Sequence, residues 1–428
     1  MLFNHSSLIF DDDPTERDEQ IMLLKSRFYR RIYYGWIMLV AVSITEVIAW
    51  GILYYAYSVF ILPMALDFGV ESLTIATGFT VALLANGIAA PIVGWWLDRY
   101  GARSLMTMGS LGGCGLLLLW SRVTNPLQLY LVMAGIGVVS ATVLYEPAFA
   151  IVATWFRRKR GKALQVLTFF GAWASVLFIP LTGRLVEQMG WRSALWVLAA
   201  ILALTILPHA LLVRRSPADL GLAPDGDQSA HGQVTVIEPS FRPRDALQER
   251  RFWLLSIAFA ISSFATVAMT VHLIPLLLVR GMSLDVASTI AGLHGLMSLA
   301  GRLLIAPIGE RRSRRLVTLG LFLMQIGGLI ILLISHWPGA AFLYIALFSA
   351  GAGTQTIMRA ALLAEQYGAT NYGVISGWQN AFMTVARTVA PVGAGVLIGS
   401  VGYEGMLWCL VGLLGVGSVA LAVAEGGG

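Results

Sequence analysis

Five ionisable side chains fall inside long apolar stretches of the sequence, where a charge is hardest to accommodate. They are two acids and three bases: Glu46, Glu146, Arg302, Arg359 and Arg387. An ionised group in hydrocarbon costs several kcal/mol unless it faces a wet cavity or a partner of opposite charge. Guanidinium groups in such a cavity bind anions, and a buried carboxyl group can carry a proton. The sequence therefore indicates anion binding and proton transfer as the chemistry of these positions.

Arg387 and Arg302 are the predicted anion ligands. Arg387 lies about 11 residues, or roughly 17 Å along a helix, from the nearer end of its apolar stretch, which is beyond the reach of a snorkelling side chain. Arg302 lies about six residues, or roughly 9 Å, from the end of its own stretch. Two guanidiniums facing one cavity would suit a carboxylate, because each fork can bind it through two hydrogen bonds. The alternative is that each arginine is structural and is neutralised by a buried acid.

Glu146 and Arg359 lie at equivalent depths in the fourth and tenth apolar stretches. Opposite charges at these places could close a gate in one conformation and separate in the other. A permanent ion pair without a mechanical role is equally compatible with the sequence. Arg359, about five residues from its helix end, could also snorkel toward the interface.

Glu46 lies well inside the first apolar stretch, with no basic residue nearby in the sequence. A carboxyl group taken out of water favours its neutral form, so we interpret Glu46 as the proton-coupling group. The alternative is that Arg302 or Arg387 holds it ionised. Tyr145 and His272 complete the predicted binding site. Other polar or aromatic residues in the stretches are candidates to line the cavity or to bond between helices: Asn86, Trp173, His294, Trp378, Gln379 and Asn380.

Membrane-spanning helices must position these residues. Hydrophobic residues make up 57% of the 428-residue chain and charged residues only 12%, which is too few for a water-exposed surface of ordinary size. A transmembrane helix needs about 20 apolar residues. Runs of that length predict twelve spans, at residues 34–62, 73–97, 104–121, 127–154, 162–183, 192–213, 252–279, 284–308, 315–335, 339–364, 373–398 and 403–424.

The distribution of Lys and Arg predicts the orientation of these spans. Most of the 29 basic residues fall on the side of the N-terminus, whereas the opposite loops hold only Arg122, Arg184, Arg192 and Arg280. Basic loops stay in the cytoplasm, so both termini should be cytoplasmic, with the chain in the plasma (inner) membrane. Residues 1–33 are then a cytoplasmic tail, and the proline-rich residues 214–251 are a cytoplasmic linker between two six-helix halves, 34–213 and 252–428.

A short polar motif occurs at the same place in both halves. Each copy consists of a Gly or Pro, then an acid, then bases. The first copy contains Gly94, Asp98, Arg99, Gly101 and Arg103, and the second contains Glu310 and Arg311. We interpret the motif as a tight cytoplasmic turn whose carboxylate meets the N-terminus of a neighbouring helix, while the bases face anionic membrane lipid. We therefore expect this motif to take part in conformational change.

The first copy resembles the loop signature of the major facilitator superfamily, and the second copy departs from it at Ala306, Glu310 and Ser313. Further segments resemble its monocarboxylate porters and oxalate:formate antiporters: Gly35-Trp36, residues 155–163, Gly190-Trp191-Arg192, residues 217–226 and Gly301-Arg302. The resemblance covers nearly the whole chain from residue 34. It implies an all-helical secondary carrier with two pseudo-symmetric six-helix halves around a central cavity.

The same resemblance implies that Arg302 and Arg387 hold a carboxylate substrate, because the antiporter branch has basic residues at these places. The chain departs from the monocarboxylate porters at Tyr54, where they have a lysine, and at Ser298, where they have an acid. Both differences argue against the proton symport mechanism of those porters.

No motif in the sequence indicates catalysis. It has no Walker loop, its six histidines lack metal-ligand spacing, and neither cysteine has a base beside it. We therefore expect no enzyme activity, metal, cofactor or nucleic-acid partner, and the linker is too short to fold as a receptor domain. The sequence predicts a monomeric carrier of a small organic anion that works by alternating access with a proton or second anion. The alternative is an exporter of drugs or larger metabolites.

Overall fold

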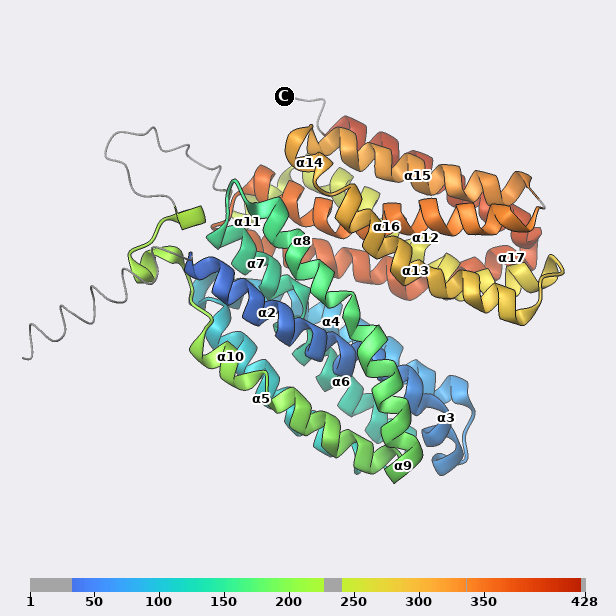
Figure 1. The fold of residues 1–428 in the computed structure, drawn as a ribbon, viewed down its shortest axis with the longest axis horizontal. Helices are drawn as coiled ribbons and strands as arrows, with labels where there is room; N and C mark the ends of the chain where they lie inside the picture. The colour runs from blue at the N-terminus through green and yellow to red at the C-terminus, as the bar shows by residue number, and fades with distance from the viewer. Residues whose placement is uncertain (1–32, 227–240, 336, 425–428) are drawn as a thin grey trace, which may run out of the picture.

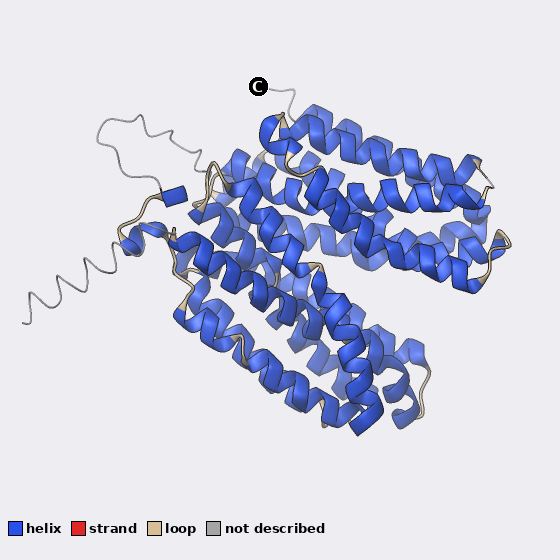
Figure 2. Ribbon diagram, in the orientation of Figure 1, coloured by secondary structure: helices blue, strands red, loops and turns tan. Residues whose placement is uncertain are grey.

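The computed structural model of the protein describes residues 33–226, 241–335 and 337–424. In these ranges every regular element is a helix or a helical turn (Figure 2). The predicted N-terminal tail, apart from Tyr33, and the middle of the predicted linker lie outside the described residues. The all-helical fold class that the sequence predicts is confirmed for the described chain.

The first half of the chain forms one bundle of helices. Its first span contains a π-helical turn, η1 (Gly51–Tyr55), between α2 (Tyr34–Trp50) and α3 (Tyr57–Phe68). The other helices are α4 (Ser72–Tyr100), α5 (Ala102–Trp120), α6 (Pro126–Val143), α7 (Tyr145–Trp155), α8 (Arg160–Gly171), α9 (Trp173–Ala203) and α10 (Ile206–Leu211). Only Leu144 separates α6 from α7, so these two helices together make one span.

The second half of the chain forms the other bundle. Its helices are α12 (Arg250–Val279), α13 (Leu284–Leu304), α14 (Ile308–Arg311), α15 (Arg314–Ile334), α16 (Pro338–Tyr367) and α17 (Tyr372–Ala424). Between the halves the described part of the linker forms the short turns η2 (Pro217–Leu220) and η3 (Pro224–Gly226) and the helix α11 (Pro243–Gln248). The second bundle therefore begins at Arg250, two residues before the predicted boundary of that half.

Two helical stretches are too long for a single crossing. Arg160–Leu211 has 52 residues and Tyr372–Ala424 has 53, which is roughly 80 Å of helix against a hydrocarbon core of about 30 Å. Both reverse direction at a glycine with positive φ, Gly190 (76°) and Gly402 (72°). Nine stretches in the described residues are long and apolar enough to span a membrane. Counting both reversals and α13 gives the twelve spans that the sequence predicts.

The two halves lie side by side and converge at one end of the molecule (Figure 1). We call it the linker end, because α11 lies there, and we call the opposite end the distal end. Toward the distal end the bundles diverge, with α3 on one side and the reversal of α17 on the other. One hydrophobic core at the linker end contains residues of both halves, whereas each half also has a core of its own. The structure is thus closed at the linker end and spread at the distal end.

Glycines allow α4 and the first part of α17 to touch through their backbones. A Cβ atom added at Gly94 would lie 2.1 Å from the carbonyl oxygen of Gly373, and one at Gly377 would lie 2.4 Å from that of Ala90. Real Cβ atoms essentially never approach another atom that closely. Small residues are the usual means by which membrane helices pack at such short range. A larger side chain at either glycine would therefore push the two halves apart.

The described parts of the linker are anchored to both halves. The buried Asp225 carboxylate accepts hydrogen bonds from the backbone amides of residues 157–159, at 2.8 to 3.2 Å. Farther along the linker, the Phe241 carbonyl accepts a hydrogen bond of 2.7 Å from the side chain of Asn371. The linker therefore holds the turn before α8 in one half and the turn before α17 in the other.

Candidate functional site

Glu146 and Arg359 form an ion pair between the two halves. Nη2 of Arg359 on α16 lies 3.0 Å from Oε1 of Glu146, and the two side chains are only 6% and 14% exposed. Glu146 occupies the first turn of α7. The span is broken into α6 and α7 here because Pro147 cannot donate a hydrogen bond to the Val143 carbonyl. Nη1 of Arg359 also donates to Gln379 at 3.4 Å. The side chains thus pair as the sequence allows, while the gate role stays a prediction.

Arg302 is engaged by backbone carbonyls of both halves. From α13, its Nη1 donates to the Thr168 carbonyl on α8 at 2.7 Å, and its Nε donates to the Gly353 carbonyl on α16 at 3.2 Å. The Gln165 side chain of α8 in turn donates to the carbonyl of Arg302 at 3.1 Å. These bonds occupy much of the guanidinium and join the halves. The predicted role of Arg302 as an anion ligand stays a prediction.

Arg387 lies in the middle of the first part of α17 and has neither an ion pair nor a hydrogen bond through its side chain in the described chain. The groups that act on it electrostatically are Arg359 in its own half, and Tyr54 and Glu146 in the other. Arg359 is already compensated by Glu146. Arg387 is thus an uncompensated cation at the junction of the halves, which is costly unless an anion or water reaches it.

Glu46 is a fully buried carboxyl group on α2. Neither of its oxygens has a hydrogen-bond partner in the described residues, and the same holds for Nε1 of Trp50, one turn later. The alternative that Arg302 or Arg387 holds Glu46 in an ion pair is not observed in this state. A buried carboxyl group without a partner strongly favours its neutral, protonated form. Its role in proton coupling stays a prediction.

Six aromatic rings line the first half beside these charges, and we call them the aromatic wall: Trp50, Tyr54, Tyr55, Phe79, Tyr145 and Phe149. The Trp50 ring lies 5.0 Å from that of Tyr54 and 4.9 Å from that of Tyr145. The first three residues are brought together by the π-helical turn η1. Gly51 in this turn is essential, because a Cβ atom there would lie 2.2 Å from the Phe178 ring.

Of the aromatic wall, Tyr145 is the residue that the sequence predicts as a site residue. The structure places Tyr145 stacked on Phe149 at 5.0 Å and beside the Arg302 guanidinium, which acts on it electrostatically. The signal for the others was the closely spaced run Trp50, Tyr54 and Tyr55 in a span that also carries Glu46. These three rings come together only because of the π turn, and the apolar pattern of the span does not predict that turn.

The polar loop motif lies at the linker end, at the junction of the halves. The Asp98 carboxylate accepts hydrogen bonds of 2.8 Å from the backbone amides of Gly373 and Val374, in the first turn of α17. This is the contact between carboxylate and helix N-terminus that the motif predicts. Its part in conformational change stays a prediction.

The bases of the first motif copy are exposed. Arg99 lies over the rings of Trp95 and Tyr100, and Nε of Arg103 donates to the Ala210 carbonyl at 2.6 Å. Gly101 has a φ of 81°, which explains the glycine at this turn. In the second copy the side chains of Glu310 and Arg311 lie outside the described part of the structure.

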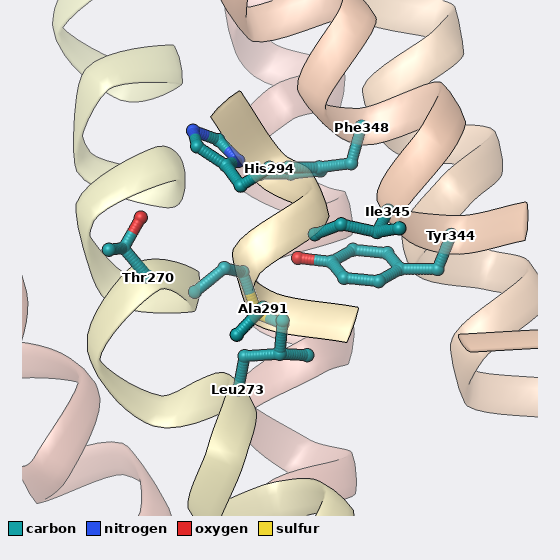
Figure 3. A pocket seen from close by; sticks show the side chains of 8 residues that line it. Thr270, Leu273, Ala291, His294, Tyr344, Ile345 and Phe348 are labelled. Atoms are coloured by element: carbon teal, nitrogen blue, oxygen red, sulfur yellow. The ribbon is translucent and has the colours of Figure 1, made fainter. Parts of the chain in front are cut away.

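The candidate histidines His272 and His294 each hydrogen-bond within the second half, and the charge of Arg302 also acts on His294. Nε2 of His272 on α12 lies 3.0 Å from the carbonyl oxygen of Pro391 on α17, so it bonds two helices of one half. Nδ1 of His294 lies 2.7 Å from the Ser349 hydroxyl, and the ring borders a cavity of about 60 Å³ that Thr270, Leu273, Tyr344 and Phe348 also line (Figure 3). Such a cavity holds a few water molecules but no larger solute.

The remaining candidates also have defined places. Asn86 on α4 and Asn380 on α17 approach each other at 3.5 Å between the halves. Gln379 accepts from Arg359, as described above. Trp173 and Trp378 are exposed to 42% and 44%, so neither is enclosed by its own half.

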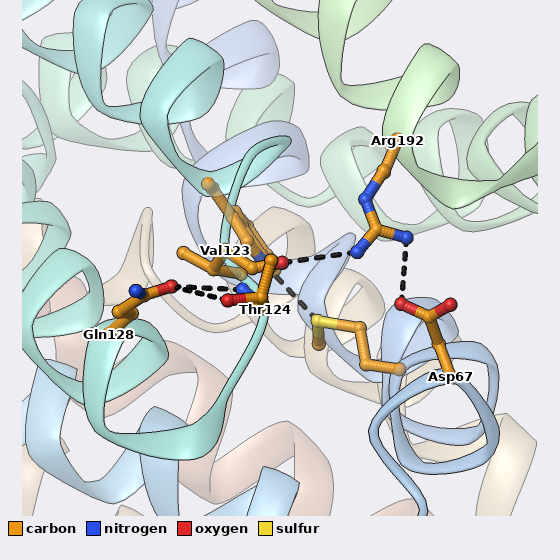
Figure 4. A network of polar contacts seen from close by, with 7 residues as sticks. Asp67, Val123, Thr124, Gln128 and Arg192 are labelled. Atoms are coloured by element: carbon orange, nitrogen blue, oxygen red, sulfur yellow. Dashed lines mark hydrogen bonds and ion pairs between the residues drawn. The ribbon is translucent and has the colours of Figure 1, made fainter.

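A separate polar network lies at the distal end of the first half (Figure 4). The Arg192 guanidinium forms an ion pair of 2.7 Å with Asp67 and donates to the Val123 carbonyl at 3.1 Å. The second half has a counterpart in which Arg280 donates to the Leu332 carbonyl. Burial lowers the pKa of Arg280, and Glu404, after the reversal at Gly402, opposes that shift. We call these two networks the distal clasps.

Known proteins share both the sequence pattern and the fold of this chain. An MFS-type transporter of Gibberella moniliformis is 28% identical over 355 residues, which are 81% of this chain and 80% of that protein. The oxalate:formate antiporter of Oxalobacter formigenes is 26% identical over 226 residues, which are 52% of this chain and 50% of the antiporter. The crystal structure of the human organic anion transporter MFSD10 has a TM-score of 0.67 at 14% identity, over 90% of this chain and 98% of that one.

The family itself follows from a match over most of the chain. The profile of the Major Facilitator Superfamily matches residues 39–312 and 275–425, which cover all or most of every span described above. The match agrees with the fold, with two halves of six spans that meet at a polar loop motif. This integral membrane protein is a transporter that belongs to the Major Facilitator Superfamily.

Proposed function

We propose that this transporter is a secondary carrier of a small organic anion, a carboxylate, which binds between the two halves at Arg387. The observation that carries the proposal is the uncompensated guanidinium of Arg387 at their junction. The partly exposed Arg387 guanidinium has no partner among the described residues, so an incoming carboxylate supplies a charge that the site lacks. The guanidinium fork suits a carboxylate in particular, because it binds both oxygens at once.

Alternating access follows from the contacts that close the linker end. The anion enters from the distal end and neutralises Arg387, whose charge otherwise repels the nearby Arg359. The bonds from Asp98 to α17, from Glu146 to Arg359 and from Arg302 to Thr168 must then break for the linker end to open. The anion drives this change only in so far as it binds one state more tightly than the other.

Coupling and orientation complete the proposal. Glu46 carries a proton, since its buried carboxyl group has no partner that would hold it ionised in this state. The linker end, where the basic loops lie, faces the cytoplasm, and the carrier lies in the plasma membrane. A relative named for anions, the oxalate:formate antiporter, supports the substrate class.

The second candidate function is export of drugs or larger metabolites. The aromatic wall favours it, because broad aromatic surfaces bind apolar solutes without charge. The aromatic wall is weaker evidence about the substrate than the Arg387 guanidinium, since an uncharged solute would leave that guanidinium uncompensated.

A thermal-shift experiment on the purified full-length transporter tests the proposal. Small mono- and dicarboxylates should raise its apparent stability, by about 2.7 kcal/mol at a concentration of a hundred times Kd. Arg387→Gln should abolish the shift, and Arg387→Lys should weaken it, because lysine keeps the charge but loses the fork. Arg184→Gln, an exposed arginine at the distal end, is the matched control. Stabilisation by hydrophobic or cationic compounds alone would favour the exporter.

A further inference from the structure

The two sides of the junction between the halves differ in chemistry. On the side of the first half lies the aromatic wall, in which each ring is within about 5 Å of the next: Trp50 to Tyr54 at 5.0 Å, Tyr54 to Phe79 at 4.9 Å, and Tyr145 to Phe149 at 5.0 Å. On the side of the second half lie three arginines. A ligand between them meets aromatic faces on one side and guanidinium groups on the other.

The three arginines differ in their partners. Arg359 is paired with Glu146, and Arg302 donates to two backbone carbonyls. Arg387 has no partner in the described structure and interacts electrostatically with Tyr54 of the aromatic wall. Of the three, Arg387 is therefore the arginine whose N–H donors are all open to a ligand beside the aromatic wall.

The remaining surroundings disfavour a second negative charge on the ligand. The face of an aromatic ring carries negative charge density, so a second carboxylate packed against the wall would be repelled. Packing against the wall favours another ring, because aromatic pairs gain energy beyond the area that they bury. The side chains of Tyr54 and Tyr55 also make no hydrogen bond among the described residues, so their hydroxyl groups are available to a polar substituent.

We propose that the ligand is a monocarboxylate with an aromatic body, whose carboxylate binds Arg387 while its ring packs against Trp50 and Tyr54. This inference rests on the proposed function and narrows its substrate class. It excludes both small dicarboxylates, which would place a second charge against the wall, and neutral aromatic compounds, which would leave Arg387 uncompensated. It also accounts for the presence of aromatic and cationic surfaces in one site.

Binding of matched carboxylates to the purified full-length transporter tests this inference. The probes are benzoate, cyclohexanecarboxylate, acetate and oxalate, measured by thermal shift and by calorimetry. Benzoate should bind about fivefold more tightly than cyclohexanecarboxylate, which has the same charge and a more hydrophobic ring. General hydrophobic burial predicts the opposite order, so the pair separates aromatic packing from area. Acetate and oxalate should bind more weakly than either ring compound.

Variants of the aromatic wall test whether its rings cause the tighter binding of benzoate. Tyr54→Leu should remove the advantage of benzoate while acetate affinity stays unchanged, and Tyr54→Phe should retain it. Trp196→Leu, which replaces a half-exposed tryptophan on α9, is the control for loss of an aromatic residue as such. If Tyr54→Leu does not fold, the ranking of probes by the wild type still decides the question.

The outcomes separate the two proposals. Equal or tighter binding of cyclohexanecarboxylate, acetate or oxalate, still lost in Arg387→Gln, overturns the aromatic monocarboxylate and leaves the anion carrier standing. If no carboxylate binds, or if Arg387→Gln binds benzoate as the wild type does, the anion carrier fails as well.

Discussion

The two halves of this transporter share a framework and differ in their central charges. Within the membrane the first half contributes acids, Glu46 and Glu146, and the second contributes Arg302, Arg359 and Arg387. The framework repeats instead: each half ends its fifth span at a glycine of positive φ, Gly190 or Gly402.

The distal clasps repeat in place but are reversed in sign. In the first half the sixth span supplies a base, Arg192, and the first span ends near an acid, Asp67. In the second half the sixth span supplies an acid, Glu404, and the first span ends at a base, Arg280. In both clasps the arginine also bonds a carbonyl near the end of the third span, that of Val123 just after α5 or that of Leu332 in the last turn of α15. The arginine and its bond to a carbonyl are thus kept in both distal clasps, whereas the charges differ in kind where the halves meet.

The largest effect on transport is expected at Glu46, an acid that has no counterpart in the second half. Glu46→Gln should abolish uphill uptake driven by a proton gradient, because a glutamine cannot release the proton, while downhill exchange continues. Transport into proteoliposomes with and without an imposed gradient measures this. Glu187→Gln, an exposed acid of the same half, should keep uphill uptake. Undiminished accumulation by Glu46→Gln would remove Glu46 from the coupling mechanism.

The pair that joins the two halves should give the next largest effect. Arg359→Gln should destabilise the closed state by about 3 kcal/mol, because it leaves the largely buried Glu146 without its partner. Thermal unfolding in detergent, with the double variant Glu146→Gln/Arg359→Gln, measures the coupling. The double variant should be less destabilised than the two single variants predict together. Strict additivity would show that the residues do not act as a pair.

Asp98→Asn should loosen the linker end without touching the centre. The change removes the charge from two hydrogen bonds to α17, each worth about 1.5–3 kcal/mol when the acceptor is ionised. A cysteine placed at Ser376, after replacement of both native cysteines, should then react faster with a water-soluble thiol reagent. Asp245→Asn, an exposed acid of α11, is the control. Equal labelling rates in both variants would argue against a closing role of Asp98.

The smallest effects are expected at the distal clasps. Asp67→Asn should lower stability by about 0.2–1 kcal/mol, because the paired side chains are 40% and 38% exposed. High salt should reduce the difference. The reversed pair Asp67→Arg/Arg192→Glu copies the sign of the second half and should recover most of the loss. A reversed pair less stable than Asp67→Asn would mean that the two clasps are not equivalent.

Much of the framework could be predicted from the sequence, because local patterns determine it. Apolar runs of membrane length predict the spans, and the loop motif predicts that Asp98 meets a helix N-terminus. The equal depth of Glu146 and Arg359 is also a local property, and it made their pairing a possibility to test. Each of these features depends on residues close together in the chain or on the repeat between halves.

The partners of the other site residues could not be predicted in the same way. Arg302 is engaged by carbonyls of Thr168 and Gly353, and His272 by that of Pro391, and every backbone carbonyl is an equally good candidate in a sequence. Arg387 and Arg302 look alike in their apolar surroundings, yet only Arg387 lacks a partner. The aromatic wall depends on the rotation of helices about their axes, which hydrophobicity does not specify when spans are apolar on all sides.

The π-helical turn η1 has a consequence for how this span tolerates insertions and deletions. A π turn accommodates one more residue than an α-helical turn, and each residue of an α-helix turns the chain by about 100°. Loss of a single residue there would convert the turn into an α-helical one and keep α3 in register with α2, so that Tyr57 and Phe60 would still pack against Trp120. Loss of a residue elsewhere in the span would instead rotate one side of the helix relative to the other by about 100°. In a library of point deletions, residues 51–55 should therefore be the most tolerant part of the first span, and homologues without the turn should show a one-residue gap there.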